Sequence, residues 1–509
     1  MRRITRKTLA IVAAAAFVTA TPLALVPSAF AQDPTTTAPA PAGVDVNANA
    51  TLTIDKRIGD IGSTETATTA FTFNVERIAL NNNLDTVLGW AEAQDIIAAG
   101  PTAGKVLSTH TITTDAGTGQ GTATLRVGLY RVTEVKNGNY TVAAPFYVTL
   151  PLMNSDGTVN YNPTISPKNQ LLTPTKAAAD TNVGVGDKIT YTIKAPVPVG
   201  DTLRDDSRSI SQFRIVDPLI AELQYVTDSA QVTLLNAGDA TLEPTHYSVT
   251  LGDGNPDTPA DNNTLVVTFT ETGRAKLADL RAENPGLTVQ VVFDAKVLRL
   301  PASGEITNQA SIYIPNAKEP IKTTPEDTTQ QDPTNTGDTS TSTQYVNVEI
   351  TEQLGGFNST AAAGAQFNVV ACTDDGTGKY TIDADSTPLV GTTPDGTVKT
   401  EGPITAVATT DSAIASGYGM QFTRGQQYCA VETKAPAGYL INPEPTPLNL
   451  TIQGTETTRP VYTATVNNVK NNIFGRLPAT GETTMLALLA LGLVLFAGGA
   501  AYQLRQKNA

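Results

Sequence analysis

Few side chains in this chain of 509 residues have the types and spacing that chemistry requires. Cys372 and Cys429 are its only cysteines, and His110 and His246 its only histidines. In an exported protein such a cysteine pair predicts a disulfide, with two free thiols as the alternative. Neither histidine has a partner by motif, and we find no paired carboxylates at catalytic spacing, so we do not expect an enzyme with turnover.

One loop carries oxygen-bearing side chains at alternate positions, Asp253, Asn255 and Asp257. Ca²⁺ prefers oxygen ligands, so these three residues form a candidate calcium site. Thr258, however, stands where a calcium loop of the EF-hand kind requires glycine. We therefore expect an acidic, solvated loop, keep Ca²⁺ as the alternative, and expect no other cofactor.

The N-terminus has the organisation of a secretory signal peptide, residues 1–31. Four basic residues precede an apolar stretch over 9–25, and the small residues Ala29 and Ala31 flank the expected cleavage site. Residues 32–50 are mostly Thr, Ala, Pro and Asn, a composition typical of a disordered stalk. The mature chain is thus expected outside the cell.

At the other end, residues 485–504 form an uncharged apolar run followed by Arg505 and Lys507. A helix of about 20 residues rises about 1.5 Å per residue, which matches a bilayer core. The basic tail suits the cytoplasmic side, so we expect a transmembrane helix. A pentapeptide stands just before this span: Leu477, Pro478, Ala479, Thr480 and Gly481.

Composition indicates an all-β protein. Thr, Val, Ala and Gly are abundant, and the formal net charge of −14 excludes a nucleic-acid partner. Short alternating segments separated by turn residues favour sandwiches in tandem, with one short helix near 84–99. The expected domains are 51–168, 175–317 and 344–472, with a linker over 318–343.

The order of pentapeptide, apolar span and basic tail resembles the cell-wall sorting signal of Gram-positive surface proteins, here 477–509. The resemblance implies that a sortase cysteine attacks the bond between Thr480 and Gly481 and passes the Thr480 carboxyl to an amine. An ordinary C-terminal membrane anchor is the alternative.

The segment that ends in Pro167, Lys168 and Asn169 resembles the pilin motif of sortase-assembled major (backbone) pilins of Gram-positive bacteria. Val159 and Ser166 depart from it, since Trp and Tyr are usual there. The resemblance implies that the Lys168 amine takes the sorting-signal threonine of another copy. The alternative is an ordinary solvated lysine in a linker.

The middle segment resembles the collagen-adhesin A-type immunoglobulin-like domain of such pilins. The resemblance assigns Lys176, Asp217 and Asn308 to a self-formed isopeptide bond. Burial depresses the pKa of a lysine amine, and a buried carboxylic acid can relay protons while ammonia leaves. The alternative is that Lys176 and Asn308 are surface residues.

The last segment resembles the collagen-adhesin B-type domain, with Glu432 as the glutamate of its E-box and Asn468 as the acceptor. The position of the bonding lysine falls at about Glu352, so no isopeptide bond is expected unless a distant lysine substitutes. A bond between Cys372 and Cys429 would then tie two strands of this domain instead, and Glu432 would be structural or serve sortase recognition.

The first segment offers a looser set, Lys56, Glu134 and Asn162. We do not expect a cross-link among them, because a rigid bond beside Lys168 would obstruct access to that amine.

Taken together, the resemblance implies the structural backbone subunit of a covalent surface pilus with three immunoglobulin-like domains, anchored in the cell wall. Its expected partners are a pilus-specific sortase, a housekeeping sortase, other copies of itself, minor pilins, peptidoglycan, and ligands on host or bacterial surfaces. The alternative is a wall-anchored adhesin of the same modules that never polymerises and runs as a single band on a denaturing gel.

Overall fold

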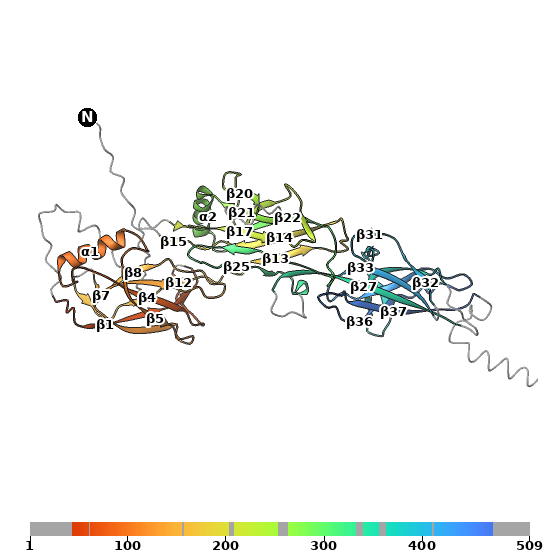
Figure 1. The fold of residues 1–509 in the computed structure, drawn as a ribbon, viewed down its shortest axis with the longest axis horizontal. Coiled ribbons are helices and arrows are strands. Elements are labelled where there is room, and N and C mark those ends of the chain that lie inside the picture. Colours follow the sequence, from red (N-terminus) through yellow and green to blue (C-terminus); the bar gives the residue numbers. More distant parts are fainter. Residues whose placement is uncertain are drawn as a thin grey trace, which may run out of the picture.

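The protein is described by a computed structural model in which three β-rich domains lie in a row (Figure 1). The predicted signal peptide, the loop with Asp253, Asn255 and Asp257, and the sorting signal 477–509 lie outside the described residues. No helix in the described part is both long and apolar enough to cross a bilayer. The structure describes residues 43–60, 62–154, 157–202, 208–252, 263–331, 339–355, 363–409 and 412–471.

The first domain is a sandwich of two sheets, accompanied in the described residues by a small three-stranded sheet and one strand pair. Its strands are β1 (Asn49–Asp55), β2 (Arg57–Ile58), β3 (Glu65–Thr66), β4 (Thr72–Ile78), β5 (Val106–Thr113), β6 (Gln120–Arg126), β7 (Gly128–Glu134), β8 (Phe146–Leu150), β9 (Leu152–Met153), β10 (Val159–Asn160), β11 (Thr164–Ile165) and β12 (Lys168–Asn169). One sheet has the order β11-β1-β6 and the other β5-β4-β7-β8. Inward side chains of β1 and β4, such as Leu52 and Phe73, are fully buried between them.

The predicted helix of this domain is confirmed as α1 (Val87–Ala98). It begins at Thr86, whose hydroxyl accepts a hydrogen bond from the backbone N–H of Gly89 at 3.1 Å. Such a cap satisfies an N–H that the first helical turn leaves free. Trp90 donates its ring N–H to the Leu84 carbonyl at 2.6 Å, which fixes the helix to the preceding loop.

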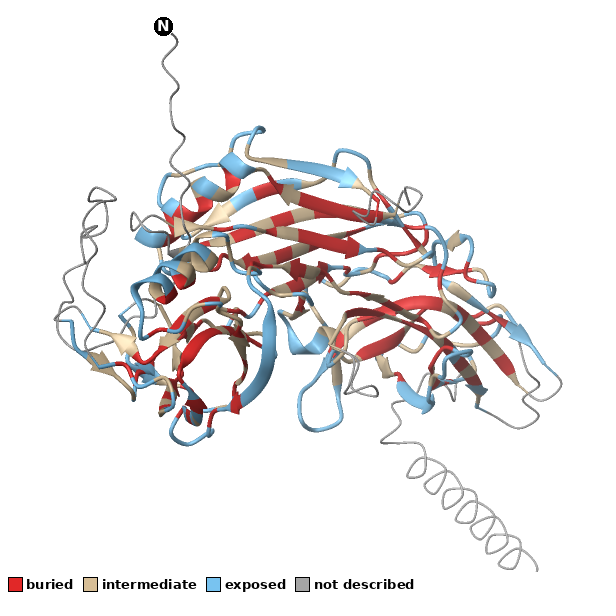
Figure 2. Ribbon diagram, turned by 60° about the vertical axis from the view of Figure 1, so that its left-hand side comes forward, coloured by how far each residue is buried: buried red, intermediate tan, exposed pale blue. Residues whose placement is uncertain are grey.

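The middle domain is a sandwich of two larger sheets and one helix, α2 (Glu271–Glu283). Its strands are β13 (Thr175–Ala179), β14 (Lys188–Pro196), β15 (Asp201–Thr202), β16 (Arg208–Ser209), β17 (Arg214–Pro218), β18 (Leu223–Tyr225), β19 (Gln231–Leu235), β20 (Tyr247–Leu251), β21 (Thr264–Phe269), β22 (Thr288–Val297), β23 (Glu305–Asn308), β24 (Ser311–Tyr313), β25 (Ile321–Lys322) and β26 (Thr324–Pro325). One sheet has the order β18-β22-β14-β13-β26, and the other β20-β21-β17-β24-β25. Buried and partly exposed residues alternate along β14 and β22, as Figure 2 shows.

The predicted linker 318–343 is in part a piece of the middle domain. Within it, β26 pairs in parallel with β13, β25 pairs with β24, and a short 3-10 helix follows at Thr328–Gln330. Ile321 is buried in the middle core, so this polar segment contributes an apolar contact that its composition hides.

The third domain is organised around its first strand. Its strands are β27 (Thr341–Leu354), β28 (Gln366–Asp374), β29 (Tyr380–Ile382), β30 (Gly391–Thr392), β31 (Lys399–Thr400), β32 (Ile404–Ala408), β33 (Ala413–Phe422), β34 (Tyr428–Lys434), β35 (Thr446–Pro447), β36 (Asn449–Ile452) and β37 (Val461–Asn468). β27 lies between antiparallel β33 and parallel β37. Its first residues also pair with β23, so one continuous strand leaves the middle domain and enters the third.

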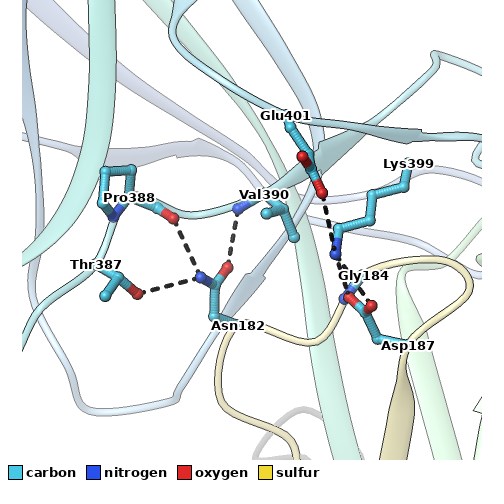
Figure 3. Close-up of polar contacts among 8 residues, drawn as sticks. All are labelled: Asn182, Gly184, Asp187, Thr387, Pro388, Val390, Lys399 and Glu401. Carbon is cyan, nitrogen blue, oxygen red and sulfur yellow. Dashed lines mark hydrogen bonds and ion pairs between the residues drawn. The ribbon is translucent and has the colours of Figure 1, made fainter.

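A second set of contacts joins the middle and third domains (Figure 3). The Asn182 side chain donates to the Pro388 carbonyl at 3.1 Å and accepts from the Val390 N–H at 2.8 Å. Lys399 forms an ion pair with Asp187 at 2.7 Å. With β27, these contacts fix the two domains to each other at more than one point.

Candidate cross-linking sites

The first domain buries a lysine, a glutamate and an asparagine together. Lys56 follows the last residue of β1, and its Nζ lies 2.9 Å from Glu134 Oε1 on β7. Asn169 of β12 donates from Nδ2 to the same oxygen at 2.7 Å. All three residues are buried. In the described residues the side-chain carbonyl oxygen of Asn169 has no hydrogen-bond partner.

Aromatic rings surround the Lys56 amine. The rings of Phe71 and Phe73 have their centroids 4.9 and 5.6 Å from Nζ. Burial lowers the pKa of Lys56 from its usual value, while the Glu134 carboxylate opposes that change. The surroundings therefore favour the neutral amine, which is the nucleophilic form.

The structure corrects one member of the set that we predicted here. Asn162 is exposed, and its backbone N–H bonds the Asn160 side chain, while Asn169 occupies the buried place beside Glu134. The pairing of β2 with β12 explains the change, because it brings the residue after Lys168 inward. Alternation along a strand predicts that Lys168 and Asn169 point to opposite faces, but only the pairing with β2 determines which of the two points inward.

Lys168 itself is half-buried rather than at an exposed junction. It stands opposite Arg57 in the parallel pair of β2 and β12. Arg57 is fixed by Asp55, with N–H donors 2.5 and 3.0 Å from one carboxylate oxygen. Partial burial and then the Arg57 charge lower the pKa of Lys168. The amine of the predicted acceptor is thus shifted toward its neutral form.

The middle domain places Lys176 of β13 and Asp217 of β17 in direct contact, both fully buried. The Lys176 amine lies 4.6 Å from the centroid of the Tyr191 ring and 5.6 Å from that of Phe293. Burial lowers the pKa of Lys176 to about 8, against the opposing effect of Asp217. Neither predicted residue is on the surface.

Asn308 ends β23 and is also buried. In the described residues neither its amide nitrogen nor its amide oxygen has a hydrogen-bond partner. Thr341 connects it to the lysine strand, because Thr341 opposes Asn308 in the sheet and donates to the Lys176 carbonyl at 3.1 Å. A buried amide without partners is costly, which marks this position as more than a packing residue.

The third domain retains two parts of such a site. Glu432 of β34 accepts from the Asn468 side chain at 2.8 and 2.9 Å and from the Asn442 N–H at 2.6 Å. Glu352, where a lysine would be needed, is buried, and neither carboxylate oxygen has a partner in the described residues. The structure thus offers an acceptor amide and an acid, and a second carboxyl group in the place of the amine.

The predicted disulfide between Cys372 and Cys429 is confirmed. It connects β28 with β34, adjacent strands that already pair at Val370 and Cys429. No group of three metal-binding side chains occurs in the described residues, which do not include the acidic loop with Asp253, Asn255 and Asp257. Of the two histidines, His110 is exposed, and His246 accepts from the Glu243 N–H at 3.0 Å.

Two regions of the chain match known protein families. Residues 49–170 match the family described as Gram-positive pilin subunit D1, N-terminal domain, and residues 472–509 match the LPXTG cell wall anchor motif. Fimbrial subunit type 1 of Actinomyces viscosus is 31% identical over 444 residues, which cover 83% of this chain and 81% of the relative.

Two further relatives extend the likeness. Fimbrial subunit type 2 of Actinomyces naeslundii is 30% identical over 417 residues, covering 75% of this chain and 71% of that protein. The structure of the full-length major pilin SpaD from Corynebacterium diphtheriae has a TM-score of 0.54 at 24% identity, covering 84% of this chain and 99% of SpaD. That likeness shows the fold, three tandem immunoglobulin-like sandwiches.

Proposed function

Because the chain belongs to the family of Gram-positive fimbrial subunits, we propose that it forms a pilus shaft in which Thr480 of one copy is joined to Lys168 of the next. It is a structural subunit and not an enzyme. Its LPXTG motif anchors it at the cell wall, where a sortase processes it and joins it to other pilin subunits.

The surroundings of Lys168 are the observation that carries the intersubunit bond. Acyl transfer needs a neutral amine, and the neighbouring Arg57 and partial burial both favour that form. The first domain lies at one end of the row and the third, which leads to the anchor, at the other (Figure 1). Lys168 lies on β12, two residues before Gln170, whose side chain accepts from the Val199 N–H of the middle domain at 3.0 Å. A bond from Lys168 to Thr480 would therefore join the C-terminal end of one copy to the side of the next copy's first domain that faces its middle domain.

Within each copy we propose two amide cross-links, Lys56 to Asn169 and Lys176 to Asn308. In each, the neutral lysine Nζ attacks the asparagine Cγ, a C–N bond forms, and the bond to Nδ2 breaks. The neighbouring carboxyl, Glu134 or Asp217, relays a proton from the amine to the leaving nitrogen, which departs as ammonia. The apolar surroundings favour the reaction because they disfavour the charged lysine.

The specific partners follow from the proposed role as a shaft subunit. A pilus-specific sortase would form the bond at Lys168, and a housekeeping sortase would transfer the last subunit to peptidoglycan. Minor pilins would join the same fibre.

The intersubunit bond is tested by tandem mass spectrometry of surface material from the native host. We expect a branched peptide that joins Lys168 to the carboxyl of Thr480. Lys168→Arg should abolish the ladder of covalent polymers, while Lys105→Arg, at an exposed lysine of the same domain, should leave it intact. Ladders that persist in Lys168→Arg, or single bands in the native host, would favour the unpolymerised wall-anchored adhesin.

The internal cross-links are tested by the intact mass of the full secreted chain. We expect a mass lower by two ammonia molecules than the sequence requires. Glu134→Gln and Asp217→Asn should each restore one of them, because the proton relay is lost while the shape of the side chain is kept. A wild-type chain with the full expected mass would refute both cross-links.

A further inference from the structure

The first and third domains place their acceptor asparagines at equivalent positions in the sheet. In the first domain Arg57 opposes Lys168 in parallel strands, so Lys56 is level with the preceding residue and Asn169 follows two residues later. In the third domain Glu352 opposes Val466 in the parallel pair of β27 and β37, and Asn468 also follows two residues later. Strand residues two apart share a face, so each asparagine lies diagonally beside its partner.

The two glutamates correspond as well. Glu134 accepts from the acceptor asparagine and, through Oε2, from the backbone N–H of Ala143 at 2.9 Å. Glu432 accepts from Asn468 and, through one oxygen, from the Asn442 N–H. Among the residues that the structure describes, the carbonyl oxygen of the acceptor amide has no hydrogen-bond partner in either site. The sites therefore differ in one member, Lys56 against Glu352.

We propose that Glu352 and Glu432 share one proton in this buried site, so that the third domain carries a proton-dependent contact where the first carries a covalent one. We also infer that the other two members, Glu432 and Asn468, are still competent to accept an amine placed at position 352. The covalent part of this inference rests on the amide-forming chemistry proposed above. The proton-sharing part stands without it.

Burial is the physical reason for the shared proton. Glu352 is 3% exposed and Glu432 is 6% exposed, so a second negative charge would be placed in an apolar site without compensation. Two neighbouring carboxyl groups in such a site do not both ionise readily, and one proton between them removes the repulsion. In the described residues neither carboxylate oxygen of Glu352 accepts a hydrogen bond. When Glu352 is protonated, its carboxyl gains an O–H that can donate one, which the ionised form cannot do.

The neighbouring strands offer no neutralising charge. β33 and β37, which flank β27, contain no charged residue, and their ionisable side chains are Tyr418 and Tyr462. On β27 and β34 themselves, Glu349 and Lys434 are exposed. Lys470, two residues beyond Asn468, forms no ion pair with either carboxyl in the described residues.

The direction of the pH dependence follows from this. Burial, and then the Glu432 charge, raise the pKa of Glu352 to about 7, and burial also raises the pKa of Glu432. A carboxyl whose pKa is raised by folding stabilises the fold below its unfolded value, about 4.3. That stabilisation is lost as the pH rises to about 7. The third domain should therefore open more readily at pH 8 than at pH 5.

The covalent half is tested on the full secreted chain with Glu352→Lys. We expect this chain to lose one more ammonia molecule than wild type, each relative to the mass its own sequence requires. We also expect a branched peptide that joins position 352 to Asn468. The matched control, Glu352→Lys with Asn468→Ala, should keep that ammonia. If Glu352→Lys folds without this loss while the first two domains still show theirs, the equivalence of the sites is wrong. If no domain loses ammonia, the proposed cross-linking chemistry fails instead.

The proton-sharing half is tested with Glu352→Gln, which keeps the shape and cannot titrate. In the full wild-type chain, hydrogen exchange of β27 and β37, corrected for intrinsic rates, should show an opening constant at least about tenfold larger at pH 8 than at pH 5. Infrared spectra at pH 6 should show a protonated carboxyl band that Glu352→Gln lacks. Equal pH dependence and equal bands in both chains would overturn the shared proton, whether or not Glu352→Lys folds.

Discussion

Lys168 and Asn169 are consecutive residues of β12, yet their side chains have opposite surroundings. Asn169 is 2% exposed and bonds Glu134 at 2.7 Å, whereas Lys168 is half-buried beside Arg57. Adjacent strand residues point to opposite faces, so one strand presents an amine outward and an amide inward. A cross-link at Asn169 would fix the two-residue strand that carries the acceptor, rather than obstruct it.

We predict that Asn169→Ala removes the cross-link of the first domain. The intact mass should then show one lost ammonia instead of two. Without the amide, the buried Lys56–Glu134 pair loses a hydrogen-bonded neighbour and β12 its tether, so local stability should fall by about 2–4 kcal/mol. Hydrogen exchange of β2 and β12 measures that change.

The control is Asn162→Ala, at the exposed residue that the sequence suggested. It should leave the loss of two ammonia molecules, relative to the mass expected for its own sequence, and the exchange of β2 and β12 unchanged. Two lost ammonia molecules in Asn169→Ala would contradict the assignment of the acceptor.

Arg57 should tune the reactivity of Lys168. Partial burial and then the Arg57 charge lower the pKa of Lys168, so Arg57→Gln should raise that pKa and reduce the neutral fraction at pH 7. Transfer of an LPATG peptide to Lys168 by the pilus sortase should slow roughly two- to threefold at pH 7 and recover as the pH rises. Arg57→Lys keeps the charge and should keep the profile. An unchanged pH profile in Arg57→Gln would show that burial alone lowers the pKa of the Lys168 amine.

The buried sites show what sequence patterns can and cannot predict. Lys176 and Glu432 were identified because they stand in recognisable segments, and the structure buries both. Asn169 was missed because it was treated as part of a linear motif, whereas its role depends on which face of β12 points inward. Only pairing with β2, between residues far apart in the chain, determines that face.

Local structure was predictable where the local signal was strong. The helix around Trp90 was expected and is α1. Helix α2 was missed, although Thr270 caps it and its hydroxyl accepts from the Gly273 N–H at 3.1 Å, a signal that the sequence does contain. β25 and β26 could not be predicted, since two-residue strands in a polar segment form only because a sheet edge is there to pair with.

Asn182 should control the junction between the middle and third domains. It has a left-handed backbone, with φ of 55°, and its side chain bonds Thr387, Pro388 and Val390. Asn182→Gly loses the side-chain bonds, at a cost of about 1–3 kcal/mol. Asn182→Ala also strains the backbone, which adds about 1 kcal/mol.

Hydrogen exchange of β30 and small-angle scattering should therefore show the most rigid junction in wild type, a looser one in Asn182→Gly and the loosest in Asn182→Ala. If neither variant loosens the junction, β27 and the remaining contacts, such as the Lys399–Asp187 ion pair, would be sufficient to hold the two domains together.

The third domain should be the part of the shaft that extends under load. In the proposed shaft, tension between Lys168 and Thr480 would enter the middle domain at β13 and leave it beyond β23. The proposed bond from Lys176 to Asn308 would then carry the force past the residues between them. In the third domain no such bond joins β27 to β37, which are its first and last strands. There, the disulfide protects only the segment between Cys372 and Cys429.

Pulling a single chain from Lys168 and the C-terminus should thus show one unfolding event, in the third domain. Reduction of the disulfide, with its separation of 57 residues, should lengthen that event by about 200 Å at about 3.5 Å per residue. In Glu352→Lys, the new bond would carry the force from β27 to β37 and the event should disappear. A second unfolding event of the size of the middle domain in wild type would mean that Lys176 and Asn308 are not joined, and the load path argued for this shaft would be wrong.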